Sequence, residues 1–502
     1  MKTTISFSQG QYRAATSWRG WDLEDTSYAL GFSSRSSTDQ NILVREVFVP
    51  AEGDVKRSRY YVQPSPLFLC RLYDRAVALG ATEIIQLHDH PFCHSPRFSG
   101  IDDAAGIRMA ADLVRIGIKA RVSQIVLGRD NERYQARVVR GVGSNDSFHP
   151  VNNLEIVGSQ SWSSYEKGNI DHEIETAHLP SSAFETRNIQ AFGRKAIRSL
   201  HQIRILILGG GGLGSAMAYM LSHLGVWNIG TMDYDRIDAS NINRQYFVVK
   251  PSSAIGRMKA SFLTGALRMF NRRGRYHAVN GNIFDQSHGP MAVKNADLVI
   301  CTLDSQSARD EAAVLCARYG KPLLNVANSI YLDKSGKLEA AFAVSQWFIP
   351  RDPDYPCLRC QGVINPDTVN SELMSDRLKA MKQKAGYVVG TPISPAPQVI
   401  PINGVAAGYA AWELVMWLSG VRKPTPFIHY DVMSHRMNLL RPLRDPACTV
   451  CGDDPSSCLV TGDSDFDLIS DAQEQSDDAL PPKIDSAAAL SPEVQLQRES
   501  KE

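Results

Sequence analysis

Two histidines and a carboxylate lie close together in the stretch EIIQLHDHPFCHSPRFSGIDDA. A strand expected at residues 84–87 would deliver His88 and His90, and the two-residue period of a strand places both imidazoles on one face. Asp102 or Asp103 follows after a polar loop. Two neutral imidazoles and one carboxylate leave a fourth position open for water, which is the ligand set of a catalytic zinc rather than of a closed structural site.

Four of the nine cysteines form two C-x-x-C pairs, Cys357 with Cys360 and Cys448 with Cys451. Nine cysteines in a chain of this length do not suggest a disulfide scaffold, and in a reducing compartment such pairs indicate metal binding. Four thiolates suffice for a closed tetrahedral zinc site that joins two distant segments. Two unlinked turns or redox pairs are the alternative, and Cys458 is close enough to be an extra ligand or a bystander.

A glycine-rich turn lies between an apolar run and a segment of helical character, in the sequence IRILILGGGGLG of residues 203–214. Gly209, Gly211 and Gly214 fit G-x-G-x-x-G, and without Cβ atoms they let the backbone approach phosphates, while the helix N-terminus supplies free N–H groups. Asp233, about twenty residues further on, would take the ribose hydroxyls. Nicotinamide-dependent dehydrogenases and nucleotide-activating enzymes both use such a unit.

The residues that follow Asp233 separate these two classes of enzyme. The segment DYDRIDASNINRQ of residues 233–245 resembles the D-x-D-x-x-x-x-S-N-L-x-R-Q signature of the MoeB/ThiF family and the related ubiquitin-activating enzymes. Residues 255–259 resemble the family's G-x-x-K, and residues 297–304 resemble its third strand, which ends in an aspartate. The resemblance runs from about Arg187 to Cys451, and it includes the positions of the two cysteine pairs, which match the structural zinc of that family.

This resemblance implies an adenylation site that binds ATP and Mg²⁺. Its residues are Gly209, Gly211, Gly212, Gly214, Asp233, Asn241, Arg244, Lys259 and Asp304. Arg244 and Lys259 are suited to neutralise the charge that develops as pyrophosphate leaves, and the hard carboxylate of Asp304 suits magnesium. Asn241 would hold a phosphate or the attacking carboxylate. Arg187 matches the position from which family members offer an arginine, often across a dimer, to the triphosphate.

The histidine cluster resembles a second family, the JAMM/MPN metalloproteases, whose signature is H-x-H-P followed by S-x-x-D. His88, His90, Ser99 and Asp102 occupy these positions, and Glu24 has the spacing to Gly31 expected for the family's upstream glutamate. The resemblance implies that Glu24 takes a proton from zinc-bound water and that Ser99 helps to hold the oxyanion during amide cleavage. Departures at Asp89, at Ser27 and in a longer loop leave a related fold without catalysis as an alternative.

These sites require an α/β protein of more than one domain, which a length of 502 residues also favours. We expect a JAMM-like α/β domain over residues 1–165, a linker over 166–182, and a Rossmann-like ThiF-type domain with a structural zinc over 183–460. Residues 461–502 have few large apolar side chains and an excess of acid, which predicts a disordered tail. Helices are expected near residues 183–202 and 403–418.

The composition gives no global reason to expect nucleic acid or an anionic membrane as a partner, because 54 basic residues balance 53 acidic ones at a formal net charge of +1. The N-terminus lacks the apolar core of a signal peptide. The most apolar helical stretch is interrupted by Glu413 and is marginal in length for a bilayer span. These features predict a soluble, cytoplasmic protein.

The combined resemblances imply that one part adenylates the C-terminal glycine of a ubiquitin-like protein whose tail ends in small residues, and that the other processes or deconjugates it. Residues 361–400 contain no cysteine that could take over the activated protein as a thioester. A separate nucleophile, a conjugating-enzyme cysteine or a sulfur donor, is therefore expected, and the family implies a homodimer. The alternatives are a nicotinamide-dependent oxidoreductase and a non-catalytic scaffold. The partner, the acceptor and the pathway are open.

Overall fold

A computed structural model describes residues 2–17, 23–36, 39–59, 61–93, 95–129, 133–140, 148–158, 162–166, 185–373, 397–454 and 456–463. Residues 1–462 form one compact unit. The tail predicted for residues 461–502 lies outside the described residues from residue 464 onward, and the predicted linker lies outside them from residue 167 onward. The predicted domain boundaries therefore stay predictions.

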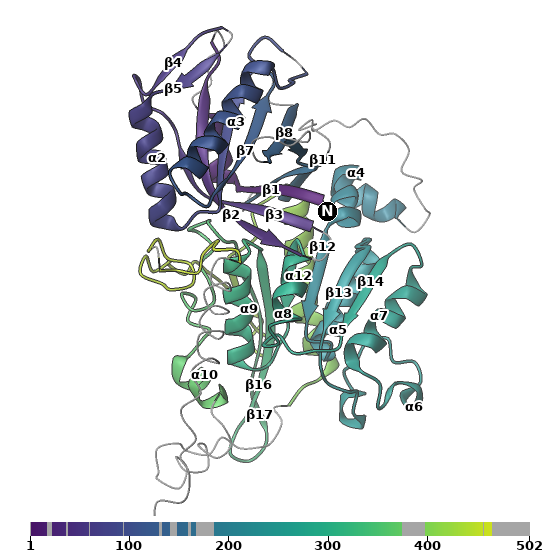
Figure 1. Ribbon diagram of the computed structural model, residues 1–502. Coiled ribbons are helices and arrows are strands. Elements are labelled where there is room, and N and C mark those ends of the chain that lie inside the picture. The colour runs from purple at the N-terminus through teal and green to yellow at the C-terminus, as the bar shows by residue number, and fades with distance from the viewer. Residues whose placement is uncertain are drawn as a thin grey trace, which may run out of the picture. The chain divides into compact units, whose positions relative to one another are not determined.

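The N-terminal part of the chain forms a mixed nine-stranded sheet (Figure 1). In sheet order its strands are β11 (Trp162–Glu166), β10 (Asn153–Val157), β1 (Lys2–Ser8), β3 (Asp39–Phe48), β2 (Thr26–Arg35), β6 (Glu83–Asp89), β7 (Arg121–Leu127), β8 (Tyr134–Val139) and β9 (Phe148–Pro150). A small hairpin joins β4 (Val55–Arg57) to β5 (Val62–Pro64).

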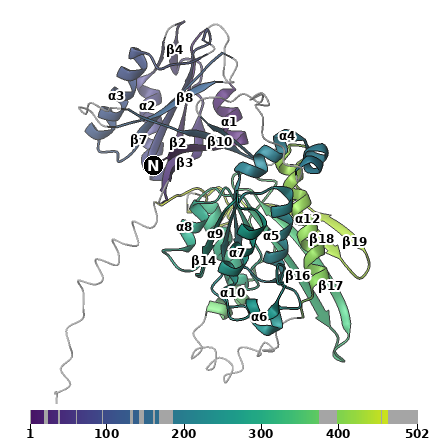
Figure 2. The same ribbon diagram turned by 90° about the vertical axis from the view of Figure 1, so that its right-hand side faces the viewer.

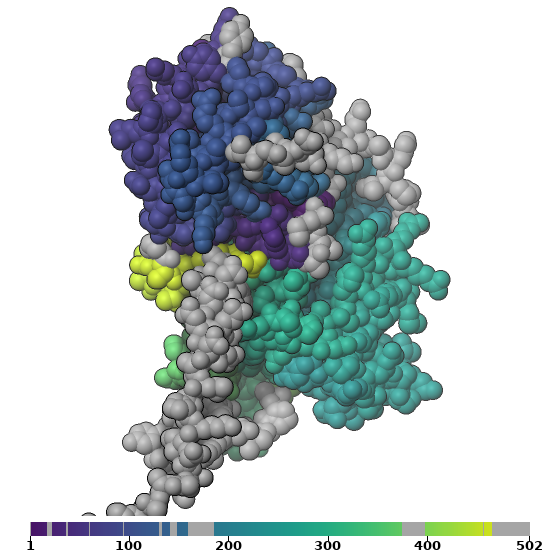
Figure 3. All heavy atoms as spheres, viewed as in Figure 1, coloured from purple at the N-terminus to yellow at the C-terminus, as the bar shows by residue number. Residues whose placement is uncertain are grey.

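Helices cover both faces of this sheet, because successive strand residues point to opposite sides. Ile84 packs with buried side chains of α2 (Pro66–Leu79) and α3 (Gly100–Arg115), whereas its neighbour Ile85 packs on the other side with Ala15 of α1 (Gln9–Thr16). On the face seen in Figure 3, the purple and blue side-chain atoms of this region pack against one another. β6 is buried on both faces, since all of its residues, polar ones included, are buried.

The second sheet has eight strands and carries the Rossmann-like order. In sheet order they are β14 (Arg275–Val279), β13 (Asn228–Met232), β12 (Arg204–Leu208), β15 (Leu298–Cys301), β16 (Leu323–Leu332), β17 (Leu338–Phe348), β18 (Phe427–Asp431) and β19 (Arg436–Leu440). The five strands from β14 to β16 are parallel, and β12, the first in the chain, lies in their middle. Strand order therefore reverses at β12, which is where α/β sheets bind ligands.

Helices flank the second sheet on both faces (Figure 2). They are α4 (Thr186–Gln202), α5 (Gly212–Leu224), α6 (Pro251–Ala254), α7 (Lys259–Phe270), α8 (Gly289–Lys294), α9 (Gln306–Arg318), α10 (Pro366–Leu373) and α12 (Ile400–Leu418), with the short helix η1 (Ala239–Asn241). The predicted apolar helix is α12; it begins slightly before the expected residue and packs on α5 and the sheet through one core. Across the described residues, no helix combines the length and the apolar character that crossing a bilayer requires.

Hydrogen bonds join the two sheet regions within the compact unit. Arg351 donates from Nη1 to the carbonyl of Val44 on β3 at 2.7 Å, and Trp417 donates from Nε1 to the carbonyl of Gly158 at 2.8 Å. Arg204, paired with Asp297, also reaches Asp39 at 2.9 Å. Buried polar groups of one region thus find partners in the other, as burial requires.

Candidate functional site

The glycine loop lies where β12 ends and α5 begins, at the point of reversed strand order. Gly209 has a left-handed φ of 93°, and a Cβ there would lie 2.9 Å from Oγ1 of Thr302. A Cβ on Gly214 would lie 1.8 Å from the carbonyl oxygen of Gly209, so that position accepts no side chain. The loop is therefore as tight as the sequence pattern predicts.

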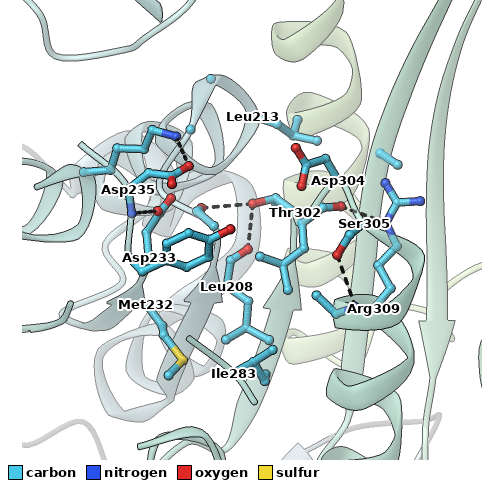
Figure 4. A pocket seen from close by; sticks show the side chains of 18 of the residues that line it. Leu208, Leu213, Met232, Asp233, Asp235, Ile283, Thr302, Asp304, Ser305 and Arg309 are labelled. Carbon is cyan, nitrogen blue, oxygen red and sulfur yellow. Dashed lines mark hydrogen bonds and ion pairs between the residues drawn. The ribbon is translucent and has the colours of Figure 1, made fainter. Parts of the chain in front are cut away.

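A cavity of about 550 Å³ opens above this loop, within the size range of ligand sites. Among the predicted residues that line it are Gly209, Gly211, Gly212, Asp233, Asn241, Arg244, Lys259 and Asp304. Figure 4 shows Asp233 and Asp235 on one side of the cavity and Asp304, Ser305 and Arg309 on the other. The structure brings these residues together, apart from Gly214, which lies buried in α5, and Arg187, which is exposed on α4 and does not line the cavity.

Asp233 fixes the loop as well as facing the cavity. One of its carboxylate oxygens accepts a hydrogen bond from the backbone N–H of Gly210 at 2.7 Å, and the other accepts one from the N–H of Asp235 at 2.8 Å. Burial raises the pKa of Asp233, and these hydrogen bonds and Lys259 oppose the shift. The carboxylate keeps further lone pairs that could receive ribose hydroxyls.

The two predicted cations are already held by polar partners. Lys259 pairs with Asp235, with Nζ and Oδ2 2.7 Å apart. Arg244 donates from Nε to Oε1 of Gln398 at 3.1 Å and from Nη1 to the carbonyl of Ser240 at 2.5 Å. Both side chains therefore reach the cavity in defined orientations, which limits the reorganisation needed to meet a phosphate.

Three residues that the sequence reasoning missed shape the far side of the cavity. Arg309 donates from Nε to the carbonyl of Leu303 at 2.7 Å, and so supports the turn that presents Asp304. Glu372 of α10 accepts hydrogen bonds from the first two N–H groups of α9, at 3.2 and 2.7 Å. Gln398 holds Arg244. Only the spacing of Arg309 after Asp304 gave a local signal, because the other two arrive from distant segments.

The four paired cysteines come together as one cluster, with all four sulfur atoms within 4.8 Å of one another. Cys357 and Cys448 have their Sγ atoms 3.6 Å apart, and so do Cys360 and Cys451. Tetrahedral zinc with Zn–S bonds of about 2.3 Å requires sulfur atoms about 3.8 Å apart, so this donor set fits zinc. The cluster is therefore neither two separate pairs nor part of a disulfide framework, and none of the nine cysteines forms a disulfide.

His88, His90 and Asp102 also form a cluster, with their ligand atoms within 4.8 Å. Nε2 of His88 lies 3.1 Å from Oδ1 of Asp102, and Nε2 of His90 lies 3.7 Å from Oδ2. His88 is 2% exposed, and neither of its ring nitrogens has a hydrogen bond of acceptable geometry to a described residue. Because buried nitrogens require a partner, the cluster fits a metal ion bound by two imidazoles and a carboxylate. Asp103 pairs instead with Arg137, and Asp102 is the aspartate that lies with the two histidines.

Glu24 lies beside this cluster, and its environment raises the pKa of its carboxyl group toward neutral pH. Burial raises the pKa of Glu24 to about 7, with His88 lowering it and Asp102 and Asp89 raising it. For Asp102, burial would raise the pKa, but His88 and the hydrogen bonds from Ser99 outweigh burial and hold it well below its usual range. A carboxyl group with a raised pKa and a carboxylate with a lowered pKa thus lie side by side, which is typical of functional sites.

Ser99 is exposed and caps α3. Its Oγ donates to Oδ2 of Asp102 at 2.7 Å and accepts from the backbone N–H of Asp102 at 3.3 Å. Its hydroxyl thus orients the carboxylate of Asp102, and the oxyanion role that the family resemblance implies for Ser99 stays a prediction.

Comparison with known proteins finds relatives for the second sheet region. A sequence model of the ThiF family matches residues 185–450. The Caenorhabditis briggsae protein "Adenylyltransferase and sulfurtransferase MOCS3" is 27% identical over 308 residues, covering 61% of this chain and 67% of that protein. The Escherichia coli (strain K12) "Molybdopterin-synthase adenylyltransferase" is 26% identical over 266 residues, covering 53% and 93%. A crystal structure of E. coli MccB with succinimide is similar with a TM-score of 0.42, at 20% identity over 54% of this chain and 75% of that one.

These matches confirm the Rossmann-like ThiF prediction for this region and do not favour an oxidoreductase. They do not test the metalloprotease resemblance of the first 165 residues, which stays a prediction.

Proposed function

The chain belongs to the ThiF family, and from this we propose that residues 183–460 adenylate the C-terminal glycine of a ubiquitin-like protein. The observation that carries the proposal is the single cavity in which the glycine loop, Arg244, Lys259 and Asp304 converge. Relatives named as adenylyltransferases support the reaction class.

ATP would supply the adenylyl group, which is joined to the substrate's carboxylate as pyrophosphate leaves. Free N–H groups at the start of α5 would bind phosphate, and Asp233 would orient the ribose. Arg244 and Lys259 would neutralise the charge that grows on the departing oxygens, and Asp304 would hold Mg²⁺. Asn241, beside Arg244, would hold a phosphate or the attacking carboxylate.

The partner would be a small protein whose tail ends in small residues, because the carboxylate must reach the base of a confined cavity. A conjugating enzyme or a sulfur-carrier pathway would receive the activated product, since residues 361–400 offer no cysteine. Arg187 is exposed and would act in a homodimer, from one protomer into the site of its partner. A cytoplasmic location belongs to the same proposal, because reduced thiolates are needed for the cysteine cluster.

ATP–pyrophosphate exchange that depends on a ubiquitin-like protein tests this function. Asp304→Asn should reduce exchange by about 100-fold or more, because it removes one preorganised charge at the reacting phosphates. Asp333→Asn, at an exposed turn between β16 and β17, is the matched control and should leave exchange unchanged. Nicotinamide binding without exchange would support the oxidoreductase instead.

A second function, zinc-dependent amide hydrolysis, is favoured by the buried His88–His90–Asp102 cluster with Glu24 beside it. We infer that this site trims or removes the same ubiquitin-like protein. Zinc would polarise a water molecule in the open fourth position. Glu24 would take the proton of that water, and Ser99 would keep Asp102 oriented.

Metal content and peptide cleavage test this second function together. The intact protein should hold two zinc ions, and His88→Ala should hold one. A peptide ending in Gly-Gly with an amide-linked fluorophore should be cleaved by the intact protein, and Glu24→Gln should slow cleavage by roughly 100-fold or more. Two zinc ions without cleavage would favour the scaffold alternative for this part of the chain.

A further inference from the structure

Four polar side chains form a row across four neighbouring strands beneath α3. Tyr28 of β2 is the register partner of Gln86 of β6, Gln86 is that of Gln124 of β7, and Gln124 is that of Arg137 of β8. Directly paired residues in a sheet present their side chains on the same face. The four residues therefore share one face of the sheet, and we call them the polar row.

Hydrogen bonds link the polar row from end to end. Gln86 donates from Nε2 to the hydroxyl of Tyr28 at 3.3 Å, and Gln124 donates from Nε2 to Oε1 of Gln86 at 3.0 Å. Arg137 donates from both Nε and Nη2 to Oε1 of Gln124, at 2.9 and 2.8 Å. None of the four is more than 8% exposed, so each bond replaces water that burial has removed.

The guanidinium of Arg137 is held in place from both sides. Its central carbon lies 3.7 Å from the ring centroid of Phe98 and 3.7 Å from that of Phe148. A cation between two aromatic faces gains cation–π attraction and loses side-chain freedom. Arg137 is therefore a rigid end of the row rather than a mobile surface charge.

The polar row holds the first turn of α3, which carries Asp102. Gln124 donates to the backbone carbonyl of Asp102 at 3.2 Å, and Arg137 donates from Nη1 to Oδ1 of Asp103 at 2.6 Å. Gly106, one turn later, lets the helix approach closely, because a Cβ there would lie 2.6 Å from Oε1 of Gln124.

The three metal-binding side chains come from two elements that the polar row connects. His88 follows Gln86 by two residues on β6 and so points to the same face, whereas Asp102 comes from α3. The position of Asp102 relative to the histidines depends on how α3 is placed over the sheet. The row is anchored on β6 and bonded to α3, and thus sets that placement.

We propose that the polar row positions Asp102 as a metal ligand, with Gln124 and Arg137 acting as positioning residues. The inference rests on the proposed zinc site. Outer partners that orient ligands commonly change metal affinity by about 10–100-fold when they are removed. Loss of the row should therefore weaken zinc binding at the histidine site by that factor and leave the cysteine cluster loaded.

Zinc competition with a graded chelator on the full-length protein tests the inference. Arg137→Met removes the donors to Gln124 and Asp103, and Gly106→Ala pushes α3 from the row while keeping every member of it. Arg121→Met is the matched control, because Arg121 lies on the same strand as Gln124 but pairs with buried Glu83. We expect the first two variants to bind the second zinc about 10–100-fold more weakly, and the control to bind it as the wild type does.

The outcomes separate the inference from the proposed function. If wild type and His88→Ala both hold a single zinc, the metal site is wrong and the inference is overturned with it. If wild type holds two zinc ions and Gly106→Ala binds zinc at the histidine site with unchanged affinity, the polar row does not position Asp102 and has only a structural role. Circular dichroism shows whether Gly106→Ala is folded. Equal weakening in Arg121→Met would also overturn the inference, since general destabilisation would then explain the effect.

Discussion

At the scale of single residues, Lys259 is a predicted phosphate-binding cation that an ion pair holds in place. Its side chain is 14% exposed and pairs with Asp235, whose side chain is half-exposed and also lines the cavity. A phosphate must compete with this carboxylate for the lysine. In the proposed reaction Asp235 would moderate nucleotide binding and Lys259 would stabilise the transition state, so substitutions of the two should act in opposite directions.

Lys259→Met should lower the exchange rate constant by roughly 100-fold, because it removes a preorganised charge. Asp235→Asn should tighten ATP binding by a few-fold, because it frees the lysine. Steady-state exchange measured against ATP concentration separates the two effects. Tighter binding in Lys259→Met, or weaker binding in Asp235→Asn, contradicts the assigned roles.

At the scale of elements, α4 is anchored by a buried histidine at its end. His201 donates from Nε2 to Oε1 of Glu185 at 2.7 Å and stacks on Trp227, with ring centroids 3.8 Å apart. Its Nδ1 is buried without a partner among the described residues. Protonation of Nδ1 would bury an N–H group with no acceptor, which is unfavourable.

Stability should therefore depend on pH through His201. Burial lowers the pKa of His201, and Glu185 only partly offsets this. The unfolded chain, with a histidine pKa of about 6.5, binds the proton first, so the stabilisation is complete above about pH 6.5 and is lost as pH falls below it. Denaturant unfolding should show that the free energy of unfolding decreases less between pH 7.5 and pH 5.5 for His201→Gln than for wild type. An equal decrease in both contradicts this assignment.

Loss of the cysteine cluster should lower the thermal stability of the protein. It holds residues 357–360 to residues 448–451, so loss of its metal frees two segments from one another. Cys448→Ser should lower Tm by several degrees, since each kcal/mol lost shifts Tm by about 2–4 °C even in a domain of about 150–250 residues, and by less in a larger unit.

Scanning calorimetry measures Tm for Cys448→Ser and for the control variant Cys458→Ser. Cys458 lies outside the cluster, so its substitution should change neither Tm nor zinc content. An equal loss of zinc from both variants would instead make Cys458 a ligand.

The elements around the glycine loop and β6 were predictable from sequence because each carries its own local pattern. The apolar run of β12 followed by glycines, and the apolar run of β6 followed by histidines, needed no distant contact to be recognised. Glu372 and Gln398 were missed because their roles come from partners brought close only by folding. The break of α4 at Gly193, with φ of 82°, was hidden by good helical spacing on either side.

At the scale of the whole molecule, the two proposed sites share no residue, and their chemistries differ. One requires a nucleotide cavity lined by cations, and the other requires two imidazoles and a carboxylate around a metal. If one chain both activates a C-terminal glycine and hydrolyses the resulting amide, the rates of the two reactions should be independent of each other. Substitutions at one site should then leave the other reaction intact.

Glu24→Gln in the full-length protein should slow peptide cleavage by roughly 100-fold or more and keep ATP–pyrophosphate exchange at the wild-type rate. Asp304→Asn should do the reverse, because its carboxylate faces only the nucleotide cavity. Both reactions measured on both variants, with zinc content as a check on folding, form the test. A loss of exchange in Glu24→Gln at full zinc content would show that the two sites are coupled, since Glu24 is not among the residues lining the nucleotide cavity.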